Sequence, residues 1–347
     1  MMRGLLGLVA IVMALTVSAK HTEAVVLLVS SDTAGTSSIG RITSYDGITG
    51  QFIDTRFGPI DNSINSMAPG PNGTVYVGEV NNRANTGRVL RIDGRTGELI
   101  DVLIPSLNTP AAMRIGPDGN LYVLRSGRNP QIQRYDAQTG DFIDNFASQS
   151  LVVPQSLAFG PDGNLYVPSN IILSDGSRQS FVSRFDGASG IFLGSFQTAA
   201  SIVATELEFG PDGNLYVAGP FDDNIARYNP ITGEFIDEFI SSGLSFPDSL
   251  EFGPDGNLYV SARNPSPGGT IGSIQRFDGT TGEFIDEFVT PGSGGFGFPR
   301  PGFFFTSLSD PTTLPEPTTL TVLGLGLFGL AIALRRQRRH QANRSWL

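Results

Sequence analysis

Short apolar runs alternate with turns rich in glycine, proline and aspartate along most of the chain. The clearest repeated unit is Phe-Gly-Pro-Asp-Gly-Asn-Leu-Tyr-Val, which occurs at Phe159–Val167, Phe209–Val217 and Phe252–Val260. Altered copies stand at Pro69–Val77 and Ile115–Val123. Proline pre-sets φ at the first corner of a turn, and glycine accepts a positive φ at its end. Each copy therefore predicts two antiparallel strands joined by a tight turn.

A second unit alternates with the first and predicts another pair of strands. Its copies are Arg134–Asp144, Arg227–Asp237 and Arg276–Asp286, with weaker ones around Asp46, Asp93 and Asp186. In each clear copy an aspartate or asparagine can accept bonds from the turn backbone, and a glycine takes the strained position. The prolines of the first unit recur every 43 to 50 residues. Four short strands in such a period are typical of a β-propeller blade.

The last full repeat shows the order of strands within a blade. Strands a to d are expected at Ser249–Phe252, Asn257–Ala262, Ser273–Phe277 and Glu283–Val289. Strand b is apolar on both faces, as expected of a sheet packed between two neighbours. Strand d carries acidic residues, which protect an outer edge strand against further pairing. The aspartates of the first unit lack the spacing of a calcium loop and are predicted to act in the turns, at Asp118, Asp162, Asp212 and Asp255.

The two ends of the repeat region predict how the ring closes. Six copies of the second unit accompany only five of the first, because the chain enters in mid-blade. Strands b, c and d are expected at Ala24–Ser30, Gly40–Tyr45 and Gln51–Phe57, and Pro299–Thr306 would supply the missing strand a. The sequence therefore predicts a single all-β domain over residues 24–306, a six-bladed β-propeller closed by N- and C-terminal strands.

Composition excludes several classes of function. Cysteine is absent, so disulfides, thiolate metal ligands and thiol nucleophiles are excluded. Between Lys20 and Thr313 there are 17 basic and 32 acidic residues, and so acidic a body repels phosphate backbones. We therefore expect no nucleic-acid partner. The single tryptophan, Trp346, lies outside the repeats, which excludes the repeated Trp-Asp of WD-repeat propellers.

Both termini predict targeting segments rather than parts of the fold. The apolar run Leu5–Val17 predicts a secretory signal over residues 1–19. After a linker at residues 307–314, the 17 uncharged residues Thr318–Leu334 predict one short C-terminal transmembrane helix. The arginines that follow should stay cytoplasmic together with residues 340–347, which leaves the propeller outside the cell membrane.

The tail at residues 315–339 resembles the PEP-CTERM sorting motif. The resemblance rests on a Pro-Glu-Pro triplet, a Gly/Leu-rich span and an arginine cluster, at Pro315, Glu316, Pro317, Arg335, Arg336, Arg338 and Arg339. It implies recognition by an exosortase, in bacteria that make extracellular polysaccharide, and processing of the tail. The protein is then expected to reach the cell envelope, surface or extracellular matrix, anchored in the membrane by its C-terminal helix before processing.

The repeats resemble those of the NHL-repeat group and of the virginiamycin-B-lyase-like and gluconolactonase-like propellers. The resemblance covers roughly Val25–Thr306 and rests on Gly-Pro-Asp-Gly-Asn-Leu-Tyr-Val and Ile-Gln-Arg-Tyr-Asp. These are blade-building residues, which identify a fold better than an activity. The chain has only His21 and His340, both outside the repeats, so a histidine-dependent lyase mechanism has no base. No catalytic residue and no cofactor are predicted.

The loops between strands b and c differ in every blade, whereas the a–b turns repeat almost unchanged. Variable loops on a rigid scaffold are where binding sites are usually built. Five arginines in these loops form a candidate face for an anionic ligand: Arg83, Arg125, Arg128, Arg178 and Arg263. The alternative is that they are solvated loop charges mixed with acids such as Glu79. Candidate ligands are an extracellular polysaccharide or an envelope protein.

Alternation along strand a predicts which residues face the central channel. These are Ala68, Arg114, Ala158, Glu208, Glu251 and Phe303, with Asn65, Gln155 and Asp248 nearer the mouth. Arg114 is expected to face Glu251 across the ring and to compete with any cation for the carboxylates. Because a calcium-type site needs several converging oxygen ligands, no metal is predicted.

The sequence thus favours an exported binding or structural module of the envelope or extracellular matrix. The alternative is a metal-dependent lactonase-like hydrolase, or a lyase-like enzyme, that uses the central channel. A channel cluster of carboxylates with a bound metal would favour the enzyme. A loop face lined by arginine or aromatic residues would favour binding.

Overall fold

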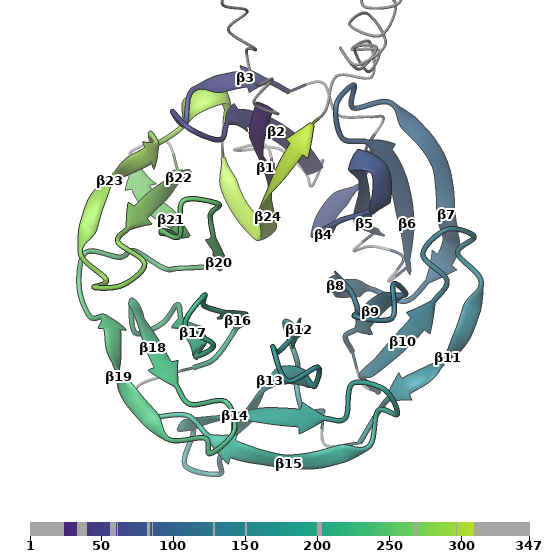
Figure 1. Ribbon diagram of the computed structural model, residues 1–347, viewed down its shortest axis with the longest axis vertical. Helices are drawn as coiled ribbons and strands as arrows, with labels where there is room; N and C mark the ends of the chain where they lie inside the picture. Colours follow the sequence, from purple (N-terminus) through teal and green to yellow (C-terminus); the bar gives the residue numbers. More distant parts are fainter. Residues whose placement is uncertain are drawn as a thin grey trace, which may run out of the picture. The chain divides into compact units, whose positions relative to one another are not determined.

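The computed structural model describes residues 24–32, 40–55, 60, 62–81, 84, 86–127, 129–149, 151–199, 203–266, 269–295 and 297–308. Within them, six four-stranded antiparallel sheets are arranged in a ring around a central axis (Figure 1). This arrangement confirms the predicted all-β, six-bladed propeller. Among these residues the structure has no helix long and apolar enough to cross a membrane. The predicted signal at residues 1–19 and the predicted span at residues 318–334 lie outside them.

Blades 2 to 6 each run from an inner strand at the channel to an outer strand at the rim (Figure 1). The strands of blades 2 and 3 are β4 (Ser63–Pro69), β5 (Thr74–Asn81), β6 (Thr86–Asp93), β7 (Leu99–Leu107), β8 (Pro110–Ile115), β9 (Leu121–Arg125), β10 (Gln131–Tyr135) and β11 (Phe142–Ala147). Those of blades 4 and 5 are β12 (Ala158–Phe159), β13 (Leu165–Ile172), β14 (Arg178–Phe185), β15 (Phe192–Gln197), β16 (Glu206–Phe209), β17 (Leu215–Gly219), β18 (Asn224–Tyr228) and β19 (Phe235–Ile240). Those of blade 6 are β20 (Ser249–Phe252), β21 (Leu258–Ser266), β22 (Gly269–Phe277) and β23 (Phe284–Val289).

Blade 1 combines strands that are far apart in the sequence. From the channel outward, its order is β24 (Phe298–Leu308), β1 (Ala24–Asp32), β2 (Gly40–Asp46) and β3 (Phe52–Asp54). β24 pairs antiparallel with β1, with Phe303 opposite Val29, and β1 pairs on its other side with β2. The inner strand of blade 1 therefore comes from the C-terminal end of the propeller, and its other three strands come from the N-terminal end.

The core lies between neighbouring blades. In β17 every residue is buried, so this strand is covered on both faces, as its apolar sequence predicts. The Tyr216 ring of β17 packs edge-on against Phe239 of its own blade and Phe252 of the next, with ring centroids 4.9 Å apart in both pairs. Burying each large side chain contributes about 1.5–3 kcal/mol, and repetition of this contact holds the blades side by side.

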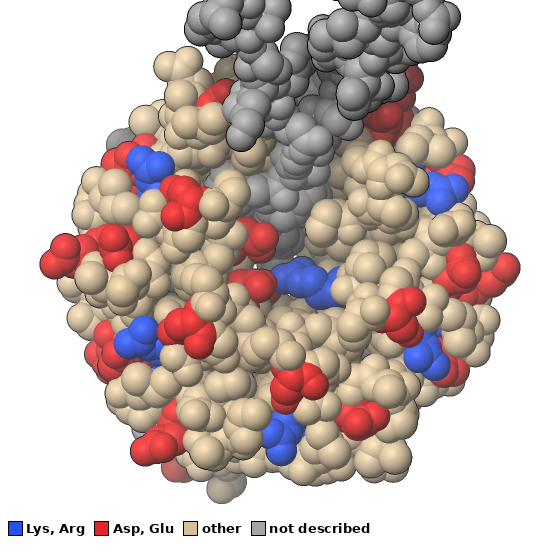
Figure 2. Space-filling model, viewed as in Figure 1, with Lys and Arg blue, Asp and Glu red and all other residues tan. Residues whose placement is uncertain are grey.

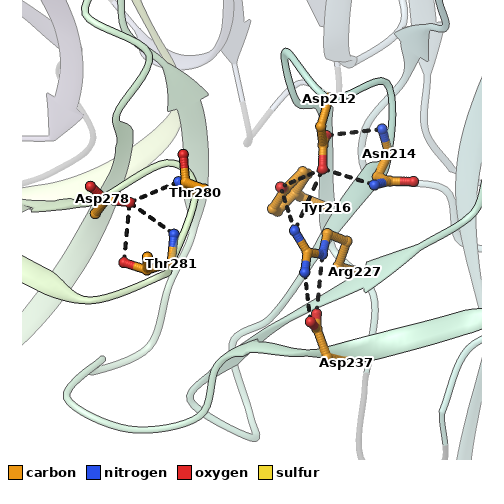
Figure 3. A network of polar contacts seen from close by, with 8 residues as sticks. All are labelled: Asp212, Asn214, Tyr216, Arg227, Asp237, Asp278, Thr280 and Thr281. Atoms are coloured by element: carbon orange, nitrogen blue, oxygen red, sulfur yellow. Dashed lines mark hydrogen bonds and ion pairs between the residues drawn. The ribbon is translucent and has the colours of Figure 1, made fainter.

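The a–b turns are held by the repeated aspartates. Asp212 accepts hydrogen bonds from the backbone N–H and the side-chain amide of Asn214, at 3.0 and 2.8 Å (Figure 3). The Tyr216 hydroxyl donates a third bond to Asp212 at 3.2 Å. The same three bonds form at Asp118, Asp162 and Asp255. These aspartates therefore act within the turns, as predicted.

The c–d turns also follow the predicted chemistry. Asp278 accepts hydrogen bonds from the backbone N–H groups of Thr280 and Thr281, at 2.9 and 2.8 Å (Figure 3). Gly282 follows with φ of +74°, and a Cβ there would lie 2.1 Å from the carbonyl oxygen of Phe239 in the neighbouring blade. Only glycine fits both this conformation and this close approach.

In each of four blades, an arginine of the third strand forms an ion pair with an aspartate of the outer strand. Arg227 lies opposite Asp237, and its Nη2 is 2.6 Å from Oδ2 (Figure 3). The guanidinium also lies 5.1 Å from the centre of the Phe239 ring. Equivalent ion pairs are Arg91–Asp101, Arg134–Asp144 and Arg276–Asp286. Blade 4 departs from this pattern, because its arginine, Arg184, lies opposite Gly194.

This difference allows a matched test of the network. Arg227→Gln should cost about 1–2 kcal/mol, because it removes a partly exposed ion pair and a cation–π contact. Arg184→Gln should cost less than about 0.5 kcal/mol, because no acidic partner is lost. Denaturant midpoints of the two variants and the parent protein measure the difference. Equal losses in both variants would show that the ion pair contributes nothing to stability.

Candidate functional site

The central channel is lined at one equivalent position of each inner strand. At this position Arg114, Glu208 and Glu251 pair with the tyrosine of the neighbouring second strand. Ala68 and Ala158 hold the same position in β4 and β12. In β24 the corresponding position is Phe304, because it pairs with Leu28, which stands in β1 where the other blades have the tyrosine. The prediction of Phe303 at this position was therefore wrong by one residue. Basic and acidic side chains meet at the centre of the ring (Figure 2).

The channel contains a cluster of one arginine and three glutamates. Arg114 Nη2 lies 3.5 Å from Glu206 Oε1 and 3.7 Å from Glu208 Oε2, both on β16. Glu251 on β20, in the blade opposite Arg114, also interacts electrostatically with the guanidinium. The sequence led us to expect Arg114 to face Glu251. The ion-pair partners of Arg114 lie on β16, one blade closer than Glu251.

Burial shifts the acid–base behaviour of this cluster. Loss of solvation raises the pKa of Glu206 to about 7, although Arg114 and a hydrogen bond from the Ser156 hydroxyl both favour the ionised form. Burial also raises the pKa of Glu208. For Glu251, burial together with the neighbouring charge of Glu208 raises the pKa well above its usual value. The channel therefore retains protons at pH values where exposed carboxyl groups are ionised.

A hollow of about 410 Å³ opens where the loops between strands b and c and between blades converge. This mouth pocket is lined by residues from blades 2 to 6: Asn65, Ala111, Ser126, Val153, Pro154, Gln155, Arg178, Thr205, Pro220, Phe221, Phe246, Asp248 and Arg263. Its volume lies within the roughly 300–1,000 Å³ of small-molecule sites.

Two arginines and two phenylalanines form a continuous ladder in the mouth pocket. The guanidinium of Arg178 lies 4.7 Å from the Phe221 ring centre, and that of Arg263 lies 4.1 Å from the Phe246 ring centre. The two rings pack edge-to-face with centroids 5.3 Å apart. Asp248 binds Arg263 through both carboxylate oxygens, whereas Arg178 forms no ion pair with any carboxylate of the described residues. The Phe221 ring is exposed, at 56% of its maximum.

Backbone strain is concentrated at this mouth. Val153 and Phe246 both line the pocket and both have positive φ, at 45° and 49°. The backbone N–H of Phe246 donates a hydrogen bond of 2.6 Å to Asp223, which holds the ring in the ladder. Bulky residues in this region of φ cost of order 1–3 kcal/mol and tend to mark functional sites.

The structure separates the five arginines of the candidate ligand face. Arg178 and Arg263 line the mouth pocket together with the three residues expected near the mouth, Asn65, Gln155 and Asp248. Arg125 instead donates a hydrogen bond to Gln131 at 3.2 Å. Arg83 and Arg128 lie outside the described residues, as does the sorting motif.

Two buried carboxylates were missed or misread from the sequence. Glu206 stands two residues before Glu208, so strand alternation places both on one face, and this signal was available. Glu79 was grouped with solvated loop acids, but it is fully buried in β5 and forms an ion pair with Arg88. This pair lines a second, polar hollow of about 330 Å³. The fold therefore stabilises a charge that the sequence alone assigns to solvent.

The channel carboxylates do not fit a divalent cation. No group of three or more histidine, cysteine, aspartate or glutamate side chains within the described ranges could hold a metal ion. The guanidinium of Arg114 stands within ion-pair distance of Glu206 and Glu208, where a cation would have to bind. A metal would therefore have to displace a fixed positive charge.

Residues 313–339 match the family model of the PEP-CTERM protein-sorting motif. The chain therefore carries this motif where the sequence predicted it, and the motif implies exosortase-mediated processing, export and sorting to the cell surface. No curated protein matches the chain.

The fold is similar to solved structures at low sequence identity. A protein of unknown function from Bacteroides caccae is 17% identical, with TM-score 0.58 and coverage of 81% of this chain and 98% of that one. The periplasmic gluconolactonase of Pseudomonas aeruginosa is 17% identical, with TM-score 0.55 and coverage of 82% and 99%. A chain of the nidogen/laminin complex is 16% identical, with TM-score 0.61 and coverage of 82% and 99%. At these identities the likeness shows the fold alone.

Proposed function

We propose that this exported propeller binds an acidic glycan at the cell surface or in the extracellular matrix, through the mouth pocket. The observation that carries the proposal is the ladder of Arg178, Phe221, Phe246 and Arg263 in a hollow of small-molecule size. A planar guanidinium binds a carboxylate through two parallel hydrogen bonds. An exposed aromatic ring provides a rigid apolar surface for the face of a sugar ring.

The roles of the ladder residues follow from their surroundings. Arg178 would bind the carboxylate, because no described carboxylate already pairs with it. Arg263 is held by Asp248 and would orient Phe246 rather than take the ligand. Phe221 offers exposed ring surface in the pocket. The strained backbone at Phe246 supports this role, since it fixes the ladder before any ligand arrives.

A second candidate function is lactone hydrolysis in the central channel. The observation that favours it is the Glu206 carboxyl group, whose pKa near 7 suits a general base at neutral pH. The gluconolactonase of similar fold has the same overall architecture. Because the donor set of the channel does not fit a metal, this hydrolase would have to work without one, with Glu206 as the general base.

Calorimetric titration of the full-length protein tests the proposed binding. The two ligands are oligogalacturonate and a neutral cello-oligosaccharide of equal length. Arg178→Gln should abolish the preference for the acidic sugar. Phe221→Ala should weaken binding of the acidic sugar about tenfold, the equivalent of about 1.4 kcal/mol. Arg125→Gln, which lies outside the pocket, is the matched control and should change nothing.

Two results would overturn this ranking. The first is oligogalacturonate affinity that is unchanged by both pocket substitutions. The second is hydrolysis of gluconolactone by the parent protein that is lost in Glu206→Gln and kept in Phe221→Ala, which would put the hydrolase first.

We also propose that the pairing of β24 with β1 closes the ring. The register of eight paired residues between these strands supports this. We further propose that the apolar span at residues 318–334 anchors the protein in the membrane until the tail is processed. The 17 uncharged residues followed by an arginine cluster support the anchor.

A further inference from the structure

The outer edge of blade 4 differs from every other edge of the ring. Of the six outer strands, all of which the structure describes, only β15 contains no acidic residue. Its sequence is Phe-Leu-Gly-Ser-Phe-Gln, where β19 and β23 have Phe-Ile-Asp-Glu-Phe. Charged side chains on an edge strand discourage pairing with another chain. β15 therefore lacks the protection that its five counterparts carry.

The same change leaves an arginine without its acid. Arg184 is the blade 4 counterpart of Arg134, Arg227 and Arg276, but it stands opposite Gly194. Its Nη1 donates a hydrogen bond of 3.3 Å to the carbonyl oxygen of Ile231 in blade 5. It also interacts with the Tyr166 hydroxyl. Within the part of the chain that the structure describes, it forms no ion pair.

The neighbouring blades show where a carboxylate would bind. In blades 5 and 6 the aspartate sits against Nη2 and Nε of the arginine, at 2.6 and 3.2 Å for Asp237 and at 2.6 and 3.1 Å for Asp286. In blade 4 the equivalent place is part of a hollow of about 210 Å³ lined by Arg184, Gly194 and neighbouring residues. Apart from the adjacent residues of the chain, no heavy atom lies within 4 Å of where a Gly194 Cβ would stand. The position is open and is flanked by a guanidinium.

The backbone of β15 is also available for pairing. The N–H of Thr198 donates to the carbonyl oxygen of Ser180 on β14 at 2.9 Å. Hydrogen bonds alternate along an antiparallel strand, so the N–H and C=O groups of Ser195 and Gln197 point away from β14. β15 lies at the rim of the ring (Figure 1) and pairs with β14 alone in the described sheets. A further strand could thus bond along this edge.

We propose that the edge of blade 4 binds an extended acidic peptide segment of a partner protein as a fifth strand. A carboxylate of that segment takes the place of the missing aspartate on Arg184. Strand addition supplies affinity through main-chain hydrogen bonds and specificity through the side chains that face the sheet. Gly194 has no side chain between the incoming strand and Arg184, so a glutamate or aspartate can reach the guanidinium across β15.

A peptide fits these observations better than a sugar acid does. An arginine that lacks its acidic partner could bind any carboxylate. The same strand, however, also lacks the charged side chains that protect an edge, and an unprotected strand edge favours a peptide. The site is at the rim, formed by β14, β15 and the c–d turn of blade 5, and shares no residue with the mouth pocket. The proposal therefore stands independently of glycan binding.

Fluorescence anisotropy with the full-length protein tests this site. The probe is a labelled peptide with the sequence of residues 233–240, Gly-Glu-Phe-Ile-Asp-Glu-Phe-Ile. Its neutral counterpart has glutamine and asparagine in place of the acids. We expect the acidic peptide to bind at least tenfold more tightly than the neutral one. Arg184→Gln should remove that preference. Ser195→Pro, which deletes an outward N–H at an edge position, should weaken both peptides about tenfold.

Matched controls separate this site from the rest of the molecule. Arg227→Gln makes the same substitution in a blade whose arginine is already paired, and it should leave peptide binding unchanged. Phe221→Ala in the mouth pocket should also leave it unchanged. Circular dichroism and thermal unfolding confirm that Arg184→Gln and Ser195→Pro are folded.

Three results would overturn the proposal. One is the absence of saturable binding up to about 1 mM peptide. Another is equal affinity of the acidic peptide for the parent protein and Arg184→Gln. The third is a combined result: oligogalacturonate displaces the peptide from the parent protein but not from Arg184→Gln, and Ser195→Pro does not change the affinity for the peptide. The site would then bind soluble carboxylates rather than a peptide strand.

Discussion

Replacing Arg114 with methionine should destabilise the protein by about 3 kcal/mol at pH 8 and by clearly less at pH 5. Removing one partner of a buried charge cluster leaves the others uncompensated, which costs about 3–5 kcal/mol. The lower end applies because the Arg114 side chain is 27% exposed in the channel and remains partly solvated. Thermal or denaturant unfolding across this pH range measures the effect.

The pH dependence follows from the raised pKa values of Glu206, Glu208 and Glu251. Between the ordinary pKa of an unfolded glutamate, about 4.3, and the folded pKa of about 7 for Glu206, the native state binds more protons than the unfolded state. The contribution of this cluster to the free energy of unfolding is therefore fully present below about pH 4.3 and is lost as the pH rises through 7. Without Arg114, ionisation of the glutamates becomes more costly, so the loss grows with pH.

Glu206→Gln combined with Glu208→Gln in the Arg114→Met background is the matched control. It removes most of the unbalanced charge and should restore much of the stability at pH 8, because an uncharged cluster of similar shape tolerates burial. An equal loss at pH 5 and pH 8 would show that Arg114 acts through packing alone.

Deleting residues 298–308 should produce the largest effect of all, the loss of a stable ring. The deletion removes β24, so β1 would lose eight paired residues and expose an unpaired edge along the channel. An open edge of this kind aggregates or pairs with another chain. Size-exclusion chromatography and thermal unfolding of the deleted protein measure the outcome.

A three-residue deletion within a loop controls for the general effect of shortening the chain. Removing residues 174–176, in the turn between β13 and β14, shortens a hairpin and leaves every inner strand in place. That protein should stay monomeric and folded. A protein without residues 298–308 that unfolds at the same temperature as the parent would refute closure by β24.

The blades could be predicted because their chemistry repeats. Pro254, Asp255 and Gly256 indicate a tight turn by their own conformational preferences, and four more copies of the unit set the period. The sequence also led us to expect a closing strand, because an incomplete blade at one end must be completed elsewhere. Such inferences depend only on local residues and on counting.

The mouth pocket and the channel cluster were harder to predict from the sequence, because they depend on contacts between blades. Phe221 and Phe246 come from loops of different blades, and their contact depends on a positive φ at Phe246. The repeated sequence units do not predict that backbone conformation. The partners of Arg114 depend on side-chain reach across the channel, so alternation gave the lining position but not the ion pair. By contrast, the missing acid at Gly194 was visible in the sequence as Ile-Phe-Leu-Gly where other copies read Glu-Phe-Ile-Asp.

The pairing of β1 with β24 also sets the order of events during folding. Hairpins within blades 2 to 6 join residues that are close in sequence and can form as the chain emerges. Val29, by contrast, can pair only after Phe303, near the other end of the propeller, is present. Contacts between such distant residues form slowly, because a long loop must close first. An exported chain that leaves the cell N-terminus first would thus complete its ring only after almost the entire propeller has crossed the membrane.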